Sequence, residues 1–85
     1  MKRIEVYSKP NCVACNATKK KLGKHGVIYD LLDAREHIDT LKALGHMSAP
    51  VVVVYDEGDT VVDHWDGYRP ERVAGLAATP APADV

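Results

Sequence analysis

Residues 6–15 of the chain read Val-Tyr-Ser-Lys-Pro-Asn-Cys-Val-Ala-Cys. The stretch starts in a short strand-like segment, 4–7, which ends at a loop of turn-forming residues over 8–11. Asn11 is expected to cap a helix over 12–25. The residues that would face inward from this helix are Val13, Ala14, Ala17, Thr18 and Leu22. The stretch therefore predicts strand, loop and helix, with both cysteines of the chain at the start of the helix.

Downstream of this helix, the spacing of apolar residues predicts five further elements. They are a strand over 27–32, a helix closed by Gly45, strands over 51–55 and 60–64, and a helix that begins at Pro70. Asp33 and Glu36 are spaced as a capping box for the middle helix. We expect a loop over 65–69 and a disordered Pro- and Ala-rich tail over 79–85, so that one domain spans 1–78.

The order β-α-β-α-β-β-α restricts the topology. A helix between the first two strands implies a right-handed parallel crossover, and the short turn at 56–59 makes the last two strands antiparallel. The run Val51–Val54 is apolar at both parities, so this strand is expected to be buried on both faces. The sequence predicts an α/β fold with a mixed four-stranded sheet of order 2-1-3-4 and three helices on its two sides.

Composition excludes several classes of protein. The chain has 85 residues, enough for one small domain, and its 11 Lys and Arg against 12 Asp and Glu give a net charge of −1. We therefore expect no nucleic-acid or membrane partner, since both need a basic excess on one face. The N-terminus shows no signal peptide, and the longest apolar run, 50–55, is too short to cross a bilayer. We expect a monomer in a reducing cytoplasm.

The two cysteines form a Cys-x-x-Cys motif that predicts thiol–disulfide exchange. A thiol at a helix N-terminus faces unsatisfied backbone N–H groups, which lower thiol pKa values to roughly 3.5–7.5 in such motifs. Cys12 is therefore predicted as the nucleophile and Cys15, one turn later, as the resolving thiol. Lys9 is predicted to support the thiolate. No metal site is expected, because zinc would need two more ligands. The possible ligands, predicted as surface residues, are His25, His37, His46 and His64.

Two other features admit two interpretations each. Pro50 opens a central strand, either as an ordinary first residue or after a cis peptide bond. The segment 65–71 contains Trp65 as either a core aromatic or part of a binding hot spot together with Tyr68 and Arg69. An iron–sulfur cluster shared between two chains is a further alternative for the cysteine pair.

These residues together resemble the thioredoxin superfamily, and more closely its glutaredoxin-like, NrdH-type redoxins. The resemblance covers about residues 3–77 and rests on 6–15, on 49–52 and on 65–71. The last block is the most specific, because the NrdH-type pattern there is Trp-Ser-Gly-Phe-Arg-Pro followed by an acidic residue. This chain departs from that pattern at Asp66, Tyr68 and Glu71, has Ala14 where Gln is frequent, and has a longer hairpin at 56–59.

The resemblance implies a thioredoxin-like fold and an electron carrier without a bound cofactor. Such carriers are reduced by thioredoxin reductase, which uses NADPH, and serve the large subunit of class Ib ribonucleotide reductase in deoxyribonucleotide synthesis. The loop over 66–69 lacks the Gly-Gly-Asp or Gly-Cys-Asp signature of glutathione-using glutaredoxins, so the resemblance does not imply glutathione use. The alternatives are a glutathione-dependent glutaredoxin and a non-enzymatic metal or iron–sulfur carrier. Pro50 would be a cis-proline facing the thiols. The residues expected to contact partners are Val13, Ala14, Ala49, Trp65, Gly67, Tyr68, Arg69 and Pro70.

Overall fold

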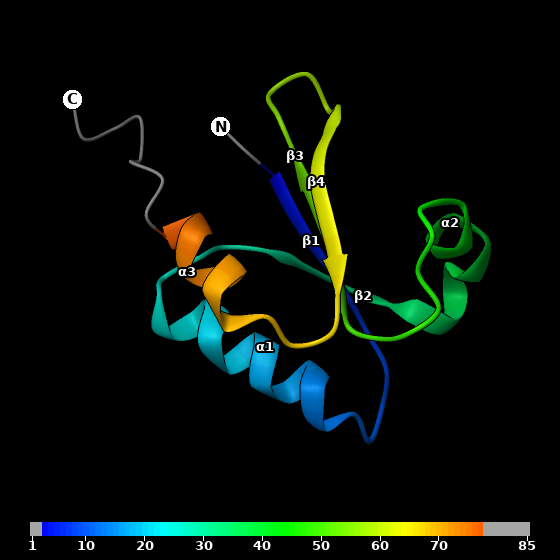
Figure 1. Cartoon of the computed structure of the whole chain (residues 1–85), viewed down its shortest axis with the longest axis horizontal. Helices are drawn as coiled ribbons and strands as arrows, with labels where there is room; N and C mark the ends of the chain where they lie inside the picture. The colour runs from blue at the N-terminus through cyan, green and yellow to red at the C-terminus, as the bar shows by residue number, and fades with distance from the viewer. Residues whose placement is uncertain (1–2, 78–85) are drawn as a thin grey trace.

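A mixed four-stranded sheet forms the centre of the computed structural model, which describes residues 3–77 (Figure 1). Its elements are β1 (Arg3–Ser8), α1 (Val13–Lys24), β2 (Asp30–Asp33), the 3-10 helix η1 (Ala34–Glu36), α2 (Ile38–Ala43), β3 (Val51–Tyr55), β4 (Val61–Asp66) and α3 (Pro70–Ala77). The tail predicted over 79–85 lies outside the described residues.

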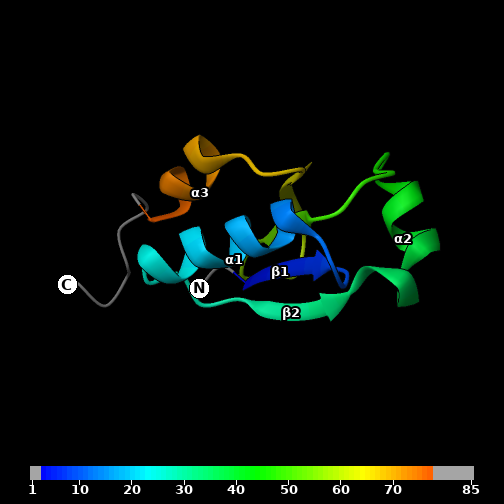
Figure 2. The same cartoon turned by 90° about the horizontal axis from the view of Figure 1, so that it is seen from below.

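The strand order is β2-β1-β3-β4. β1 pairs with β2 in parallel and with β3 antiparallel, and β3 pairs antiparallel with β4. Helices α1 and α3 lie together on one side of the sheet and α2 on the other (Figures 1 and 2). The predicted fold class, the parallel crossover and the sheet order 2-1-3-4 are confirmed.

Strand β3 joins two hydrophobic layers. Val52 and Val54 pack with Leu22 of α1 and Val73 of α3, whereas Val51 and Val53 face the α2 side with Leu41. All four valines of β3 are at most 2% exposed. Full burial of one such side chain stabilises a fold by about 1.5–3 kcal/mol. The prediction of a strand buried on both faces is confirmed, and this strand presents Pro50 at its start.

The cap of α1 differs from the prediction. Cys12, not Asn11, is the N-cap residue, and its Sγ accepts a hydrogen bond from the backbone N–H of Cys15. Asn11 has φ of 57°, a left-handed conformation that asparagine tolerates and that an N-cap residue does not adopt. Val13, predicted to face inward, is 85% exposed. The first turn of α1 is therefore rotated so that Cys15 is buried in its place.

The boundaries of two strands were also wrong. β2 begins at Asp30, where its pairing with β1 begins, because the preceding residues 27–29 follow the end of α1 without joining the sheet. β4 continues to Asp66, so that Trp65 and Asp66 lie in a strand and not in a loop. They pair with Val52 and Val51 of β3. Pairing with the buried strand β3 extends β4 beyond residue 64, where the strand predicted from residue propensities ends.

The second helical segment is divided in two. Asp33 Oδ1 accepts a hydrogen bond from the N–H of Arg35 and caps the short η1 helix. Its carboxylate also accepts hydrogen bonds from the guanidinium of Arg35. Asp33 therefore pairs with Arg35, whereas the predicted capping box pairs it with Glu36. Helix α2 starts separately after His37, which forms no side-chain cap. Ile38 and Leu41 of α2 line the groove described below.

Candidate functional site

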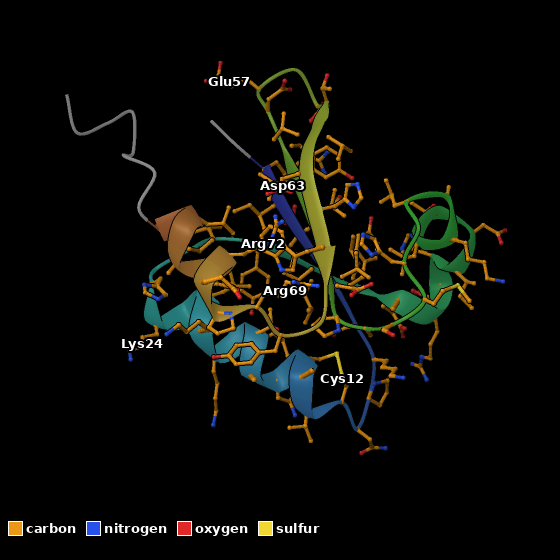
Figure 3. The ribbon with its side chains drawn as sticks, viewed as in Figure 1. Cys12, Lys24, Glu57, Asp63, Arg69 and Arg72 are labelled. Atoms are coloured by element: carbon orange, nitrogen blue, oxygen red, sulfur yellow. A yellow bond between two sulfur atoms is a disulfide. The ribbon has the colours of Figure 1, made fainter. Side chains whose placement is uncertain are left out.

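Cys12 and Cys15 form a disulfide at the N-terminus of α1 (Figure 3). Their Cα atoms are 5.2 Å apart, within the usual range for a disulfide. Cys12 is 8% exposed and Cys15 is completely buried. A partner sulfur can therefore reach Cys12 but not Cys15, which agrees with the order of attack predicted from the motif.

The local structure favours negative charge on Cys12. The N–H of Cys15 donates to Cys12 Sγ over 3.1 Å, and the first turn of α1 contains no acidic residue. In the reduced protein the same N–H groups and the positive end of the helix dipole would stabilise a Cys12 thiolate. Lys9 is exposed in the preceding loop, where it borders the groove described below.

Two other segments meet the disulfide. Cys12 Sγ lies 3.9 Å from the carbonyl oxygen of Ala49. The Ala49–Pro50 peptide bond is cis, the isomer that the family resemblance implies. The carbonyl oxygen of Pro50 accepts a hydrogen bond of 2.9 Å from the N–H of Gly67. The motif at 12–15, the start of β3 and the end of β4 thus form one site, although they are far apart in the sequence.

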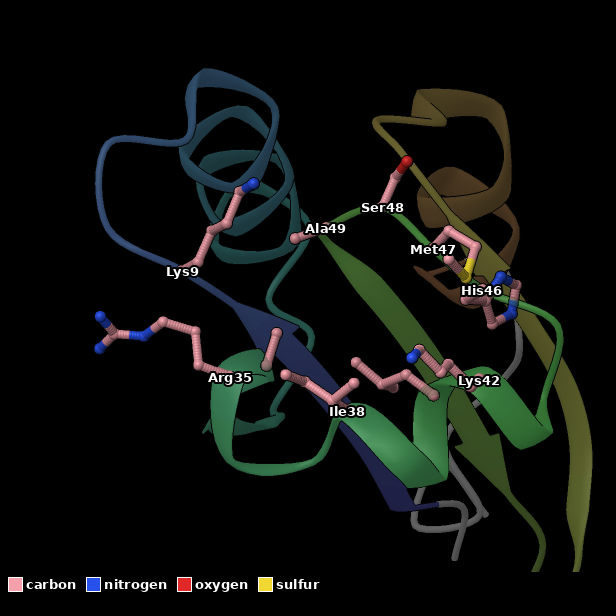
Figure 4. Close-up of a pocket in the computed structure, with 10 residues that line it drawn as sticks. Lys9, Arg35, Ile38, Lys42, His46, Met47, Ser48 and Ala49 are labelled. Carbon is pink, nitrogen blue, oxygen red and sulfur yellow. The ribbon is translucent and has the colours of Figure 1, made fainter.

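A groove of about 260 Å³ runs from this site across the α2 side of the sheet (Figure 4). Its apolar wall includes Ile38 and Met47, which are 51% and 81% exposed. No carboxylate is among the groove's lining residues, all within the described chain. The lining residues are Lys9, Ala34, Arg35, Ile38, Leu41, Lys42, His46, Met47, Ser48 and Ala49.

Among the charged residues of the groove, Arg35 forms an ion pair with Asp33. The hydrogen bonds of Arg35, from its guanidinium and its backbone N–H, lower the pKa of Asp33 to about 2, so that this carboxylate stays ionised beside Arg35. Within residues 3–77, Lys9 and Lys42 form no ion pair. The groove therefore presents two uncompensated positive charges beside an apolar wall. It also includes Ala49, whose carbonyl oxygen lies 3.9 Å from Cys12 Sγ.

The predicted contact residues at the end of β4 and in the loop before α3 differ in their exposure. Trp65 is only 4% exposed and packs in the core, which supports its interpretation as a core aromatic. Tyr68 and Arg69 are exposed, and the Nε of Arg69 donates to the carbonyl oxygen of Asp66. The predicted contact set also includes Val13, which is exposed, and Ala14 and Ala49, which are half-exposed. Its last member is Pro70, at the start of α3.

Sequence reasoning missed a cluster of polar side chains, one of which, His46, lines the groove. His46 and His64, predicted as surface residues, contact each other, and His46 also contacts Asp66. The signal available in the sequence was Asp66, which stands where the NrdH-type pattern has Ser. No pattern linked it to His46, twenty residues earlier.

Among residues 3–77, no three or more His, Cys, Asp and Glu side chains are grouped so that they could hold a metal ion. In the same range, no helix has the length and apolar character needed to cross a membrane.

Comparison with known proteins agrees with this geometry. The glutaredoxin family model matches residues 4–58. The chain is 32% identical to the glutaredoxin-like protein NrdH of Salmonella typhimurium, over 95% of this chain and 96% of the relative. It is 31% identical to that of Lactococcus lactis, over 87% of this chain and 99% of the relative.

Solved structures show the same relationship. The structure of NrdH-redoxin from Escherichia coli, described for its thioredoxin-like activity profile, is similar with a TM-score of 0.77 and 30% identity. The match covers 94% of this chain and 99% of that one. A desulfothioredoxin from Desulfovibrio vulgaris Hildenborough is similar with a TM-score of 0.73 and 25% identity, over 93% and 81% of the two chains. The chain therefore belongs to the glutaredoxin family of the thioredoxin superfamily, with NrdH-type redoxins as relatives, and is a thiol–disulfide oxidoreductase with a Cys12–Cys15 redox pair.

Proposed function

We propose that this oxidoreductase is a cytoplasmic, monomeric electron carrier between NADPH-dependent thioredoxin reductase and the large subunit of a class Ib ribonucleotide reductase. The observation that carries the proposal is the placement of the disulfide at the start of α1, with Cys12 beside Ala49 and a groove open to a polypeptide. The NrdH relatives and the thioredoxin-like activity profile described for the Escherichia coli protein support the choice of partners.

The proposed reaction moves two electrons without a bound cofactor. The Cys12 thiolate of the reduced carrier attacks one sulfur of the substrate disulfide, that S–S bond breaks, and the departing substrate thiolate takes up a proton. Cys15, as its thiolate, then attacks the Cys12 sulfur of the mixed disulfide. This releases the second substrate thiol after protonation and leaves the Cys12–Cys15 disulfide. The reductase restores the dithiol with two electrons drawn from NADPH.

The surface around Cys12 fits a protein substrate. Val13 and Tyr68 are exposed apolar or aromatic side chains, and Met47 extends this surface into the groove. Such groups are common where proteins recognise one another. In this proposal Lys9 supports the thiolate, while Gly67, Arg69 and Pro70 shape the contact loop. Trp65 acts from the core by holding β4 in place.

A glutathione-dependent reaction is the second candidate, because Lys9 and Lys42 could bind the carboxylates of glutathione in the same groove. The two candidates differ in the source of electrons. The oxidised protein and a disulfide substrate would be supplied either with NADPH and thioredoxin reductase or with NADPH, glutathione and glutathione reductase.

NADPH consumption with thioredoxin reductase alone would support the proposal. Turnover with the glutathione system alone would contradict it and establish the second candidate. For the second half of the proposal, the reduced carrier would be added to an oxidised class Ib ribonucleotide reductase. Deoxyribonucleotide formation is expected, and its absence with an active reductase would remove the assigned electron acceptor.

A further inference from the structure

His46 anchors the loop beside the redox pair to strand β4. It lies between α2 and β3, and its side chain is only 10% exposed. Its Nδ1 lies 2.9 Å from Asp66 Oδ2, and its Nε2 lies 2.7 Å from Nδ1 of His64. The two imidazoles meet edge to face, with ring centroids 4.8 Å apart. Both partners belong to β4, so one buried ring ties the loop to that strand.

The anchored loop leads directly to Cys12. After His46 it continues through Met47 and Ser48, which are exposed, to Ala49, whose carbonyl oxygen is 3.9 Å from Cys12 Sγ. The backbone N–H of His46 also donates to the carbonyl oxygen of Leu41, at the end of α2. His46, Met47, Ser48 and Ala49 all line the groove (Figure 4). A change at His46 therefore alters the wall along which a substrate chain would lie.

The two ring contacts can tolerate one additional proton but not two. When both histidines are neutral, His46 Nδ1–H donates to Asp66 and His64 Nδ1–H donates to His46 Nε2. With one proton added, His46 carries both N–H groups and donates to Asp66 and to His64, whose remaining proton moves to Nε2. With two protons added, an N–H of each ring points at the other over the same short distance. That third state has no acceptor between the rings and repels through like charges.

We propose that His46 is a positioning residue for the redox site, and that double protonation of His46 and His64 releases the loop and weakens reaction with polypeptide disulfides. This inference rests on the proposed function, since it assumes that a substrate chain occupies the groove. Its physical basis is that histidine is the side chain whose charge changes at mildly acidic pH.

The charged groups around the two rings set the direction of this effect. Asp66 and His64 face His46 from β4, and Asp66 compensates the first proton. Lys42 of α2 also lines the groove (Figure 4). Lys9 and Arg35 line the same groove. Of these groups, Asp66 is the one that contacts an imidazole through a carboxylate.

The test compares two disulfides in single-turnover reactions of the pre-reduced protein. One substrate is a synthetic peptide closed by a disulfide, which needs the groove, and the other is the small disulfide 5,5′-dithiobis(2-nitrobenzoate), which reports only on the Cys12 thiolate. The ratio of the two second-order rate constants, measured between about pH 5 and 8, removes the pH dependence of the thiolate itself. We expect this ratio to fall roughly three- to tenfold toward the acidic end, as for the loss of one hydrogen bond.

Three variants separate positioning from general damage. His64→Asn places an amide near the position of Nδ1 that can accept or donate, so the ratio should stay near its neutral-pH value throughout. His64→Ala removes the contact and should give the low ratio even at neutral pH. His25→Asn, at the far end of α1, is the matched control and should keep the acid-dependent fall. Backbone amide shifts of Ser48 and Ala49 should follow the same transition in the parent protein and not in His64→Asn.

The outcomes distinguish this inference from the proposed function. If the reduced protein reacts with both substrates and the ratio is independent of pH, or falls equally in His64→Asn, the positioning role is overturned while the oxidoreductase role stands. If the peptide disulfide is not reduced at any pH although the small disulfide is, the proposal of polypeptide substrates fails as well.

Discussion

The backbone N–H of Gly67 donates a hydrogen bond to the carbonyl oxygen of Pro50 over 2.9 Å. This bond connects the end of β4 to the start of β3 one residue beyond their last paired positions, Val51 and Asp66. It extends the ladder to Pro50, the residue after Ala49, whose carbonyl oxygen lies 3.9 Å from Cys12 Sγ. Gly67 can make it because its φ is 77°, a conformation that other residues adopt at a cost. The geometry of the redox site therefore depends on a glycine that directly follows β4.

Substitution of this glycine should weaken the fold and the site together. No atom lies within 4 Å of a Cβ built on Gly67, so Gly67→Ala meets backbone strain without a steric clash. We expect a loss of about 1–2 kcal/mol in the free energy of unfolding, measured by urea denaturation, and slower reduction of peptide disulfides. Gly23→Ala is the matched control. It also meets open space but lies within α1, and it should stabilise the protein by about 0.5–1 kcal/mol. Equal effects of the two substitutions would contradict this account.

The two cysteines should fail in different ways. Cys12→Ser removes the sulfur that a substrate can reach and should abolish turnover with both peptide and small disulfides. Cys15→Ser leaves that nucleophile but removes the buried resolving thiol, so a mixed disulfide between Cys12 and the substrate should accumulate. Mass spectrometry of the intact protein under non-reducing conditions would detect the adduct. Similar residual activity in both variants would show that the assigned order of attack is wrong.

The charge of the groove should select among peptide substrates. Lys42 has no ion-pair partner within residues 3–77 and lines the groove, so Lys42→Glu should reduce kcat/KM for a disulfide peptide with acidic flanking residues. The loss of one exposed ion pair corresponds to a change of roughly two- to fivefold in kcat/KM. A peptide with basic flanking residues should show the opposite change. Lys24→Glu, at the other end of α1 (Figure 3), makes the same charge change away from the groove and should leave both values unaltered.

Glu5 should carry a pH-dependent part of the stability. Burial by itself would raise the pKa of Glu5, but hydrogen bonds from Tyr55 and Tyr7 and the charge of Arg3 outweigh it and lower the pKa below the ordinary 4.5. Because the folded pKa is the lower one, this stabilisation is complete above the unfolded pKa and is lost as pH falls through the folded pKa.

The variant Glu5→Gln should therefore unfold more easily at neutral pH, by about 1–3 kcal/mol. Its deficit relative to the parent protein should shrink as both are taken below pH 4.5. Urea denaturation across this range would measure both effects. Glu36→Gln, at an exposed position, is the control and should follow the parent protein. A deficit for Glu5→Gln that is the same at every pH would exclude the carboxylate charge as its cause.

Most of the fold followed from local patterns. Four consecutive valines at 51–54 are apolar at both parities, and a strand with this pattern belongs in the centre of a sheet with helices on both sides. The ends of the elements were less predictable. β4 extends through Trp65 and Asp66 because β3 supplies hydrogen-bond partners, and no property of those two residues indicates that partner. Likewise Asn11 is a residue type that commonly caps helices, yet Cys12 occupies the N-cap position of α1.

The sequence by itself predicted thiol–disulfide chemistry, because two thiols three residues apart at a helix start are typical of that reaction. Tertiary structure alone decided what surrounds the thiols. Ala49 reaches Cys12, Gly67 reaches Pro50, and His46 reaches His64 and Asp66 only when β3 lies between β1 and β4. The physical reason is range: helix caps and strand periodicity depend on neighbours a few residues away. The wall of the groove, in contrast, depends on hydrogen bonds between residues 18 and 20 positions apart, which local patterns do not encode.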